Sequence, residues 1–178
     1  IFMGGVDLPD VTSLALAAIL RAKLPDLRAI TVVMGSNAPA LAQVQARAQQ
    51  MPVPTRVLTG VSNIATAMND ADLAIGAGGG TAWERCAVGL PTLMVIIADN
   101  QDVGAKALAR AGAVQLVGQA TDPGLTDAVE QALRALAANP NRLALMAQQA
   151  AAITDGSGAL RVVRALEQPL RLRPATFD

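Results

Sequence analysis

The sequence predicts an open α/β fold, in which a parallel sheet carries helices on both of its faces. Short runs rich in β-branched residues alternate with longer runs rich in alanine and leucine, and this alternation is typical of βα units. The run RAITVVMG at 28–35 is apolar almost throughout, as strands buried on both faces are. Glycines directly follow several of these runs. In such sheets, ligands bind outside the carboxyl ends of the strands.

Taken in order, the pattern predicts six strands and eight helices. The expected strands are 1–4, 28–35, 55–60, 71–77, 92–98 and 113–118. The expected helices are 10–23, 36–50 with its cap cluster, 62–68, 81–88, 101–111, 126–138, 140–153 and 157–167. Ser36 and Ser62 are suited to capping their helices, and Pro140 suits a first helical position. One domain therefore covers 1–167, and 168–178 is a tail without clear periodicity.

Composition excludes several classes of function. Lys plus Arg and Asp plus Glu number 14 each, and aromatic residues make up only 2 % of the chain, so we expect no nucleic-acid partner. Cys86 is the only cysteine and histidine is absent, which argues against a metal site and removes the commonest general base. We expect Cys86 to be a buried core thiol. We also expect no bound cofactor, no transmembrane segment and a cytoplasmic location.

The chain begins abruptly, inside an expected strand, with the residues IFMGG. We interpret this start as the edge of one domain of a larger protein, whose amino-terminal domain is not part of this chain.

The glycine turn between 71–77 and the next helix is the strongest functional signal. Gly78, Gly79 and Gly80 follow the strand, and Thr81 opens a helix that carries Glu84. Bare backbone at a helix start offers unpaired N–H groups to phosphates, and a carboxylate one turn later can accept hydrogen bonds from a ribose diol. The alternative is a loose βα turn with a solvated glutamate. We expect Glu84 to be half-buried.

Three further loops are candidates for the same site. Gly4 and Gly5 end the first strand and can form a backbone pocket for a diphosphate, although a tight turn explains them equally well. They lack the G-x-G-x-x-G spacing of dinucleotide sites.

Asp99, Asn100 and Gln101 end the strand 92–98 and suit sugar hydroxyls, with a helix cap as the alternative. Gly60 and Val61 end the strand 55–60, and the backbone there can read a base edge; an ordinary loop capped by Ser62 is the alternative.

The string DLAIGAGGGTAWERCAVGLPTLMVIIADNQ resembles the nucleotide-binding half of GT-B sugar-nucleotide enzymes. It is most similar to the UDP-sugar hydrolase of pseudaminic acid biosynthesis and to related spore coat polysaccharide proteins. In those proteins a Gly-Gly strand end, a glycine turn before a Trp-Glu helix, and A-D-N-Q occur in this order. The more distant N-acetylglucosaminyltransferase of lipid II synthesis shares the glycine turn and the glutamate.

The resemblance implies a Rossmann-like, carboxyl-terminal GT-B domain that binds a UDP-sugar. By position, Glu84 would bind the ribose, Gly5 and 79–81 would face the diphosphate, and Asn100 and Gln101 would face the sugar. Val6 stands where family members more often have Thr or Ser. The catalytic base would lie on the amino-terminal domain, the expected partner of this one. Hydrolysis of a UDP-linked amino sugar is the leading interpretation. Glycosyl transfer and a non-catalytic binding module are the alternatives.

Overall fold

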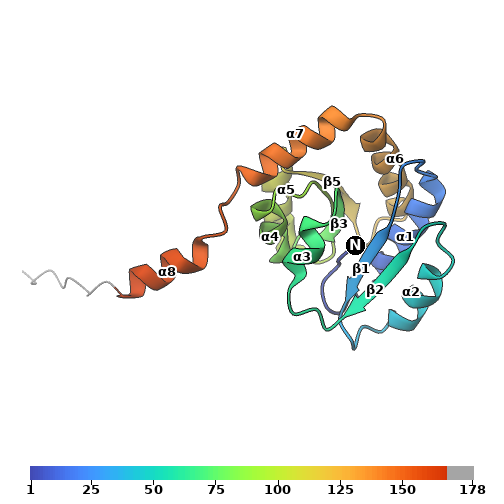
Figure 1. Ribbon diagram of the computed structural model, residues 1–178, viewed down its shortest axis with the longest axis horizontal. Coiled ribbons are helices and arrows are strands. Elements are labelled where there is room, and N and C mark those ends of the chain that lie inside the picture. The colour runs from blue at the N-terminus through green and yellow to red at the C-terminus, as the bar shows by residue number, and fades with distance from the viewer. Residues whose placement is uncertain (168–178) are drawn as a thin grey trace, which may run out of the picture.

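The computed structural model describes residues 1–167, and the predicted tail at 168–178 lies outside the described residues. Within the described residues the strands are β1 (Ile30–Met34), β2 (Thr55–Thr59), β3 (Ala74–Ala77), β4 (Thr92–Ile96) and β5 (Val114–Gln119). All of their pairings are parallel: β1 pairs with β2, and β4 lies between β3 and β5. The α/β fold that the sequence predicts is therefore confirmed (Figure 1).

The first three residues join these two groups of strands into one sheet. The Ile1 carbonyl accepts a hydrogen bond from Val33 N in β1, at 2.9 Å. On the other side, Phe2 N donates to the Ile75 carbonyl of β3, at 3.0 Å. The strand expected at 1–4 is thus reduced to a single parallel bridge, from Phe2 to Gly76, because Gly4 turns the chain away with a φ of 90°. The sheet order is β2, β1, the amino-terminal segment, β3, β4 and β5.

Helices cover both faces of this sheet. They are α1 (Val11–Ala22), α2 (Leu41–Ala48), α3 (Ile64–Asn69), α4 (Thr81–Ala87), α5 (Asp102–Arg110), α6 (Leu125–Ala137), α7 (Pro140–Ala151) and α8 (Gly158–Glu167), with a 3-10 turn at Asp99–Gln101. Alternate residues of β4 enter opposite cores. Leu93 and Val95 pack with α1 and α6, whereas Met94 and Ile96 pack with α4 and α5.

Several predicted boundaries are wrong. β3 begins at Ala74 and not at Ala71, because residues 71 and 72 are exposed and do not join the sheet. The helix expected from 36 begins at Leu41 without a side-chain cap, since turns occupy the residues before it. Asn63, and not Ser62, caps α3 by accepting a hydrogen bond from Ala65 N at 3.1 Å. Pro140 does occupy the first turn of α7.

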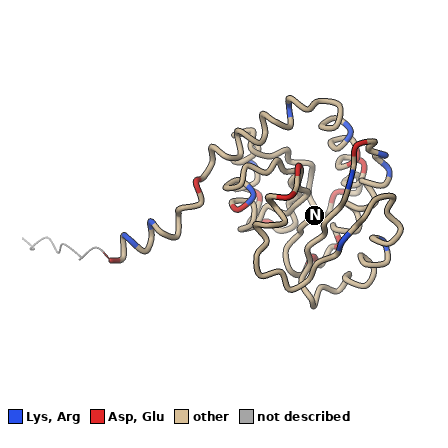
Figure 2. Tube along the Cα trace, in the orientation of Figure 1, with Lys and Arg blue, Asp and Glu red and all other residues tan. Residues whose placement is uncertain are grey.

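Charged residues of both signs are distributed along the described trace (Figure 2). One ionic cluster joins two helices: Arg21 on α1 forms salt bridges with Asp127 and Glu130 on α6. Helix α8 extends away from the other elements (Figure 1), and none of its residues is buried. Within residues 1–167, no helix is long and apolar enough to span a membrane.

Candidate functional site

The loops that the sequence singles out meet at the carboxyl edge of the sheet. The bridge from Phe2 to Gly76 runs parallel, so the segment that ends at Gly4 leads to the same edge of the sheet as Gly78. In the same way, the pairing of Ala77 with Val95 places the loop after β4 beside the glycine turn. Parallel strands end at one edge, which brings these three loops together.

The glycine turn presents three consecutive backbone amides. Its carbonyls are used internally, because Ala82 N bonds to the Gly79 carbonyl at 2.9 Å and Trp83 N to the Gly80 carbonyl at 3.1 Å. The amides of Gly79, Gly80 and Thr81 donate no hydrogen bond to any of the described residues. A Cβ at Gly80 would meet no atom within 4 Å, so that side of Gly80 is uncrowded. Unpaired amides of this kind bind anionic oxygens.

Glu84 lies in the first turn of α4 and is exposed. The expectation that it is half-buried is wrong, because it points away from the face through which Ala82 and Cys86 enter the core. Its carboxylate forms no salt bridge or hydrogen bond with any of the residues described. Both oxygens are therefore free to accept hydrogen bonds from a ligand.

Two side chains hold the glycine turn, and only one of them was expected near the site. Gln101 accepts from Gly78 N at 3.2 Å and from Ile97 N at 3.1 Å, both through its Oε1 atom. Arg85 donates from Nη2 to the Ala77 carbonyl at 2.6 Å and from Nη1 to Thr81 Oγ1 at 3.4 Å. Burial lowers the pKa of the Arg85 guanidinium to about 10, so the side chain stays charged at neutral pH. The sequence offered no local sign that Arg85 turns inward.

The amino end of α1 is already occupied by a side chain of this protein. Asp7 is buried, and its carboxylate accepts from Val11 N at 3.0 Å and from Thr12 N at 2.9 Å. These amides are the ones that a helix offers to an anion. Any anion near Gly4 and Gly5 must therefore use the loop amides and not the end of α1. Asp7 was not identified as a cap from the sequence. The signal that could have found it is an acidic residue a few positions before the start of a helix.

The remaining predicted residues lie at the same edge, but further out. Asp99 and Asn100 are exposed, and neither caps a helix by its side chain, so the alternative of a helix cap is wrong for both. Gly60, with a φ of 62°, and Val61 follow β2. Since β1 separates β2 from the amino-terminal segment, they lie two strand spacings from that segment, roughly 10 Å.

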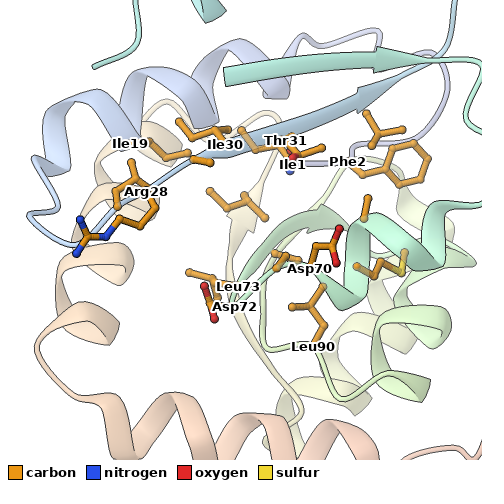
Figure 3. A pocket seen from close by; sticks show the side chains of 18 of the residues that line it. Ile1, Phe2, Ile19, Arg28, Ile30, Thr31, Asp70, Asp72, Leu73 and Leu90 are labelled. Atoms are coloured by element: carbon orange, nitrogen blue, oxygen red, sulfur yellow. Dashed lines mark hydrogen bonds between the residues drawn. The ribbon is translucent and has the colours of Figure 1, made fainter. Parts of the chain in front are cut away.

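A cavity of about 360 Å³ lies at the opposite end of the sheet. Ile30 and Ala74, which begin their strands, and Ile1, at the amino terminus, contribute to its wall, and Figure 3 shows Phe2 at one end of it and Arg28 at the other. Open α/β sheets bind their ligands at the carboxyl edge, so the glycine loops, and not this cavity, form the candidate site. Within the described residues, no cluster of potential metal ligands occurs.

An open parallel sheet with a glycine turn at the carboxyl edge of its central strands defines a Rossmann-like domain. The chain belongs to the family of glycosyltransferase family 28 C-terminal domains, whose sequence profile matches residues 11–161. Among curated proteins, it is 30% identical to the spore coat polysaccharide biosynthesis protein SpsG of Bacillus subtilis (strain 168), over 173 residues. The match covers 93% of this chain and 48% of that protein, so the chain spans about half the length of this relative.

Solved structures share the fold. MurG from Acinetobacter baumannii superimposes with a TM-score of 0.70 at 22% identity, over 93% of this chain and 48% of that one. UDP-GlcNAc 2-epimerase from Neisseria meningitidis, solved with UDP-GlcNAc bound, gives a TM-score of 0.64 at 16% identity, over 93% and 43% of the two chains. At these identities the likeness concerns the fold.

Proposed function

We propose that this chain is the nucleotide-binding domain of a GT-B enzyme that uses a UDP-linked sugar in the synthesis of a surface polysaccharide. The observation that carries the proposal is the set of three free amides at 79–81 next to the exposed carboxylate of Glu84. The amides suit a diphosphate, and the carboxylate suits a ribose diol. Further support comes from the epimerase of the same fold, which was solved with UDP-GlcNAc, and from the relative SpsG, named for polysaccharide synthesis.

In the proposed complex, each loop has a separate task. The amides of 79–81 and the loop at Gly4 and Gly5 hold the diphosphate, which is the leaving group when the bond to the sugar breaks. Such donors stabilise the negative charge that develops on the leaving oxygen. Asp99 and Asn100 extend from the edge toward the sugar, and the loop at Gly60 and Val61 faces the base.

The reaction itself needs groups that the described residues do not supply. This chain contains no histidine, and no sequence motif pairs two of its carboxylates in the way that a glycosidase requires. We therefore propose that a second domain provides the acceptor site or the base and closes the cleft over the sugar. The family match supports glycosyl transfer as the reaction. Hydrolysis of a UDP-linked amino sugar, as in pseudaminic acid biosynthesis, stays a prediction from the sequence, as does the cytoplasmic location.

A turnover assay separates these reactions. The 178-residue chain and the longer protein that contains it are each incubated with a panel of UDP-amino sugars, and UDP release is followed with and without sugar or lipid acceptors. We expect no turnover by the chain alone. We expect release by the longer protein that depends on an acceptor. Acceptor-independent release would favour hydrolysis, and equal turnover by the chain alone would contradict the two-domain proposal.

A further inference from the structure

We propose that Arg85 and Gln101 are positioning residues that clamp the peptide unit between Ala77 and Gly78, and so hold the glycine turn in the shape that binds a diphosphate. The inference rests on the proposed function, since it concerns how the same site is kept ready for its ligand. Neither side chain needs to touch the nucleotide for this role.

The peptide plane between Ala77 and Gly78 is held from both sides. Its carbonyl, which belongs to Ala77, accepts from Arg85 Nη2 at 2.6 Å. Its N–H, which belongs to Gly78, donates to Gln101 Oε1 at 3.2 Å. The carbonyl and N–H of a trans peptide point in opposite directions, so the plane cannot flip without breaking both bonds. The following amides, at 79–81, take their direction from this plane.

The clamp also depends on a missing side chain. A Cβ on Gly76 would lie 2.6 Å from Arg85 Nη1 and 2.8 Å from its Cζ, which are distances that atoms do not tolerate. The guanidinium therefore occupies the space that a side chain on Gly76 would need. Gln101 reaches the turn from the other side and also binds Ile97 N at 3.1 Å, which ties the turn to the end of β4.

Arg85 is a buried cation that hydrogen-bonds to a backbone carbonyl and a hydroxyl. The residue is 2% exposed, no carboxylate forms a salt bridge with it among the described residues, and its Nε atom has no hydrogen-bond partner there. A buried cation without a counter-charge is unfavourable. The guanidinium also borders the cavity at the other end of the sheet, so Arg85 supports the turn through the Ala77 carbonyl and Thr81 and not by direct contact with a ligand. Thr81 Oγ1 accepts from Arg85 Nη1, which leaves the hydroxyl hydrogen of Thr81 free to donate to a phosphate oxygen.

The first experiment measures binding of UDP and UMP by calorimetry. Arg85→Met and Gln101→Met each remove one arm of the clamp, and Gly76→Ala displaces the guanidinium without removing its charge. We expect UDP affinity to fall at least tenfold in all three variants and UMP affinity to fall less, because the turn holds the diphosphate. Arg85→Lys should recover part of the loss. Arg110→Met, at an exposed position on α5, is the control and should bind like the wild type.

The second experiment measures hydrogen exchange of the Gly78 amide by NMR, without nucleotide. We expect exchange at least tenfold faster in Arg85→Met and Gln101→Met than in the wild type, and no change in Arg110→Met. Unchanged exchange, or unchanged preference for UDP over UMP in folded variants, would overturn the clamp. A wild-type chain that binds no UDP would instead overturn the proposed function, while the exchange rates would still report whether the peptide is clamped.

Discussion

Glu84 is the residue on which the ribose assignment depends. It is exposed and no described residue bonds to its carboxylate, so Glu84→Gln should leave the stability of the fold unchanged. We expect UDP binding to weaken about tenfold, because hydrogen bonds to a charged group contribute roughly 1.5–3 kcal/mol. Calorimetry measures both proteins, with Glu167→Gln, an exposed position on α8, as the control. Wild-type affinity in Glu84→Gln would make the ribose role untenable.

Cys86 is 1% exposed, which confirms the predicted core thiol. Its burial also makes the stability of the fold depend on pH. Burial raises the pKa of this thiol above the ordinary value of 9.0, so the unfolded chain releases the proton before the folded one does. The stability that this difference contributes is present below about pH 9 and is lost as the pH rises further. Urea unfolding between pH 7 and 9.5 should show a decline that is flatter in Cys86→Ala. Parallel curves for the two proteins would exclude this cause.

At the scale of elements, two glycines should respond to alanine in opposite ways. Gly104 lies inside α5, and a Cβ added there would meet no atom within 4 Å, so Gly104→Ala should stabilise the protein by up to about 1 kcal/mol. Gly35 directly follows β1, and its N–H donates to the Gly5 carbonyl at 3.0 Å. A Cβ on Gly35 would collide with that carbonyl. Gly35→Ala should destabilise the fold and displace the loop at Gly5. Urea midpoints that shift in the same direction would contradict this account of the two sites.

Most helices and strands can be predicted from the local sequence pattern, whereas the tertiary hydrogen bonds between them cannot. The run at 92–98 is apolar enough to predict β4, and the glycines at 78–80 mark the turn without knowledge of the fold. Nothing near Arg85 in the sequence shows that it turns inward to a carbonyl eight residues earlier. In the same way, Asp7 became visible as a buried cap only once α1 was placed. Hydrogen bonds that depend on tertiary packing leave little trace in sequence spacing.

At the scale of the whole molecule, the amino-terminal segment determines where the site lies. Ile1 and Phe2 bond to β1 and β3 respectively, and their place at the centre of the sheet brings Gly4 to the same edge as the glycine turn. The pattern predicted a first strand but not its neighbours, because strand order depends on long-range pairing. The loop at Gly60 and Val61 is an example. It follows β2, which lies at the edge of the sheet, and its distance from the glycine turn could not be known from the sequence.

The central claim is that this carboxyl edge binds UDP, and a calorimetric titration of the 178-residue chain with UDP and ADP tests it most directly. We expect UDP to bind with a dissociation constant on the order of tens of micromolar or weaker, because one domain supplies only one wall of a cleft. ADP should bind more weakly, since the loop at Gly60 and Val61 is assigned to the uracil edge. Equal binding of the two nucleotides would contradict the base assignment, and no binding of either would contradict the site itself.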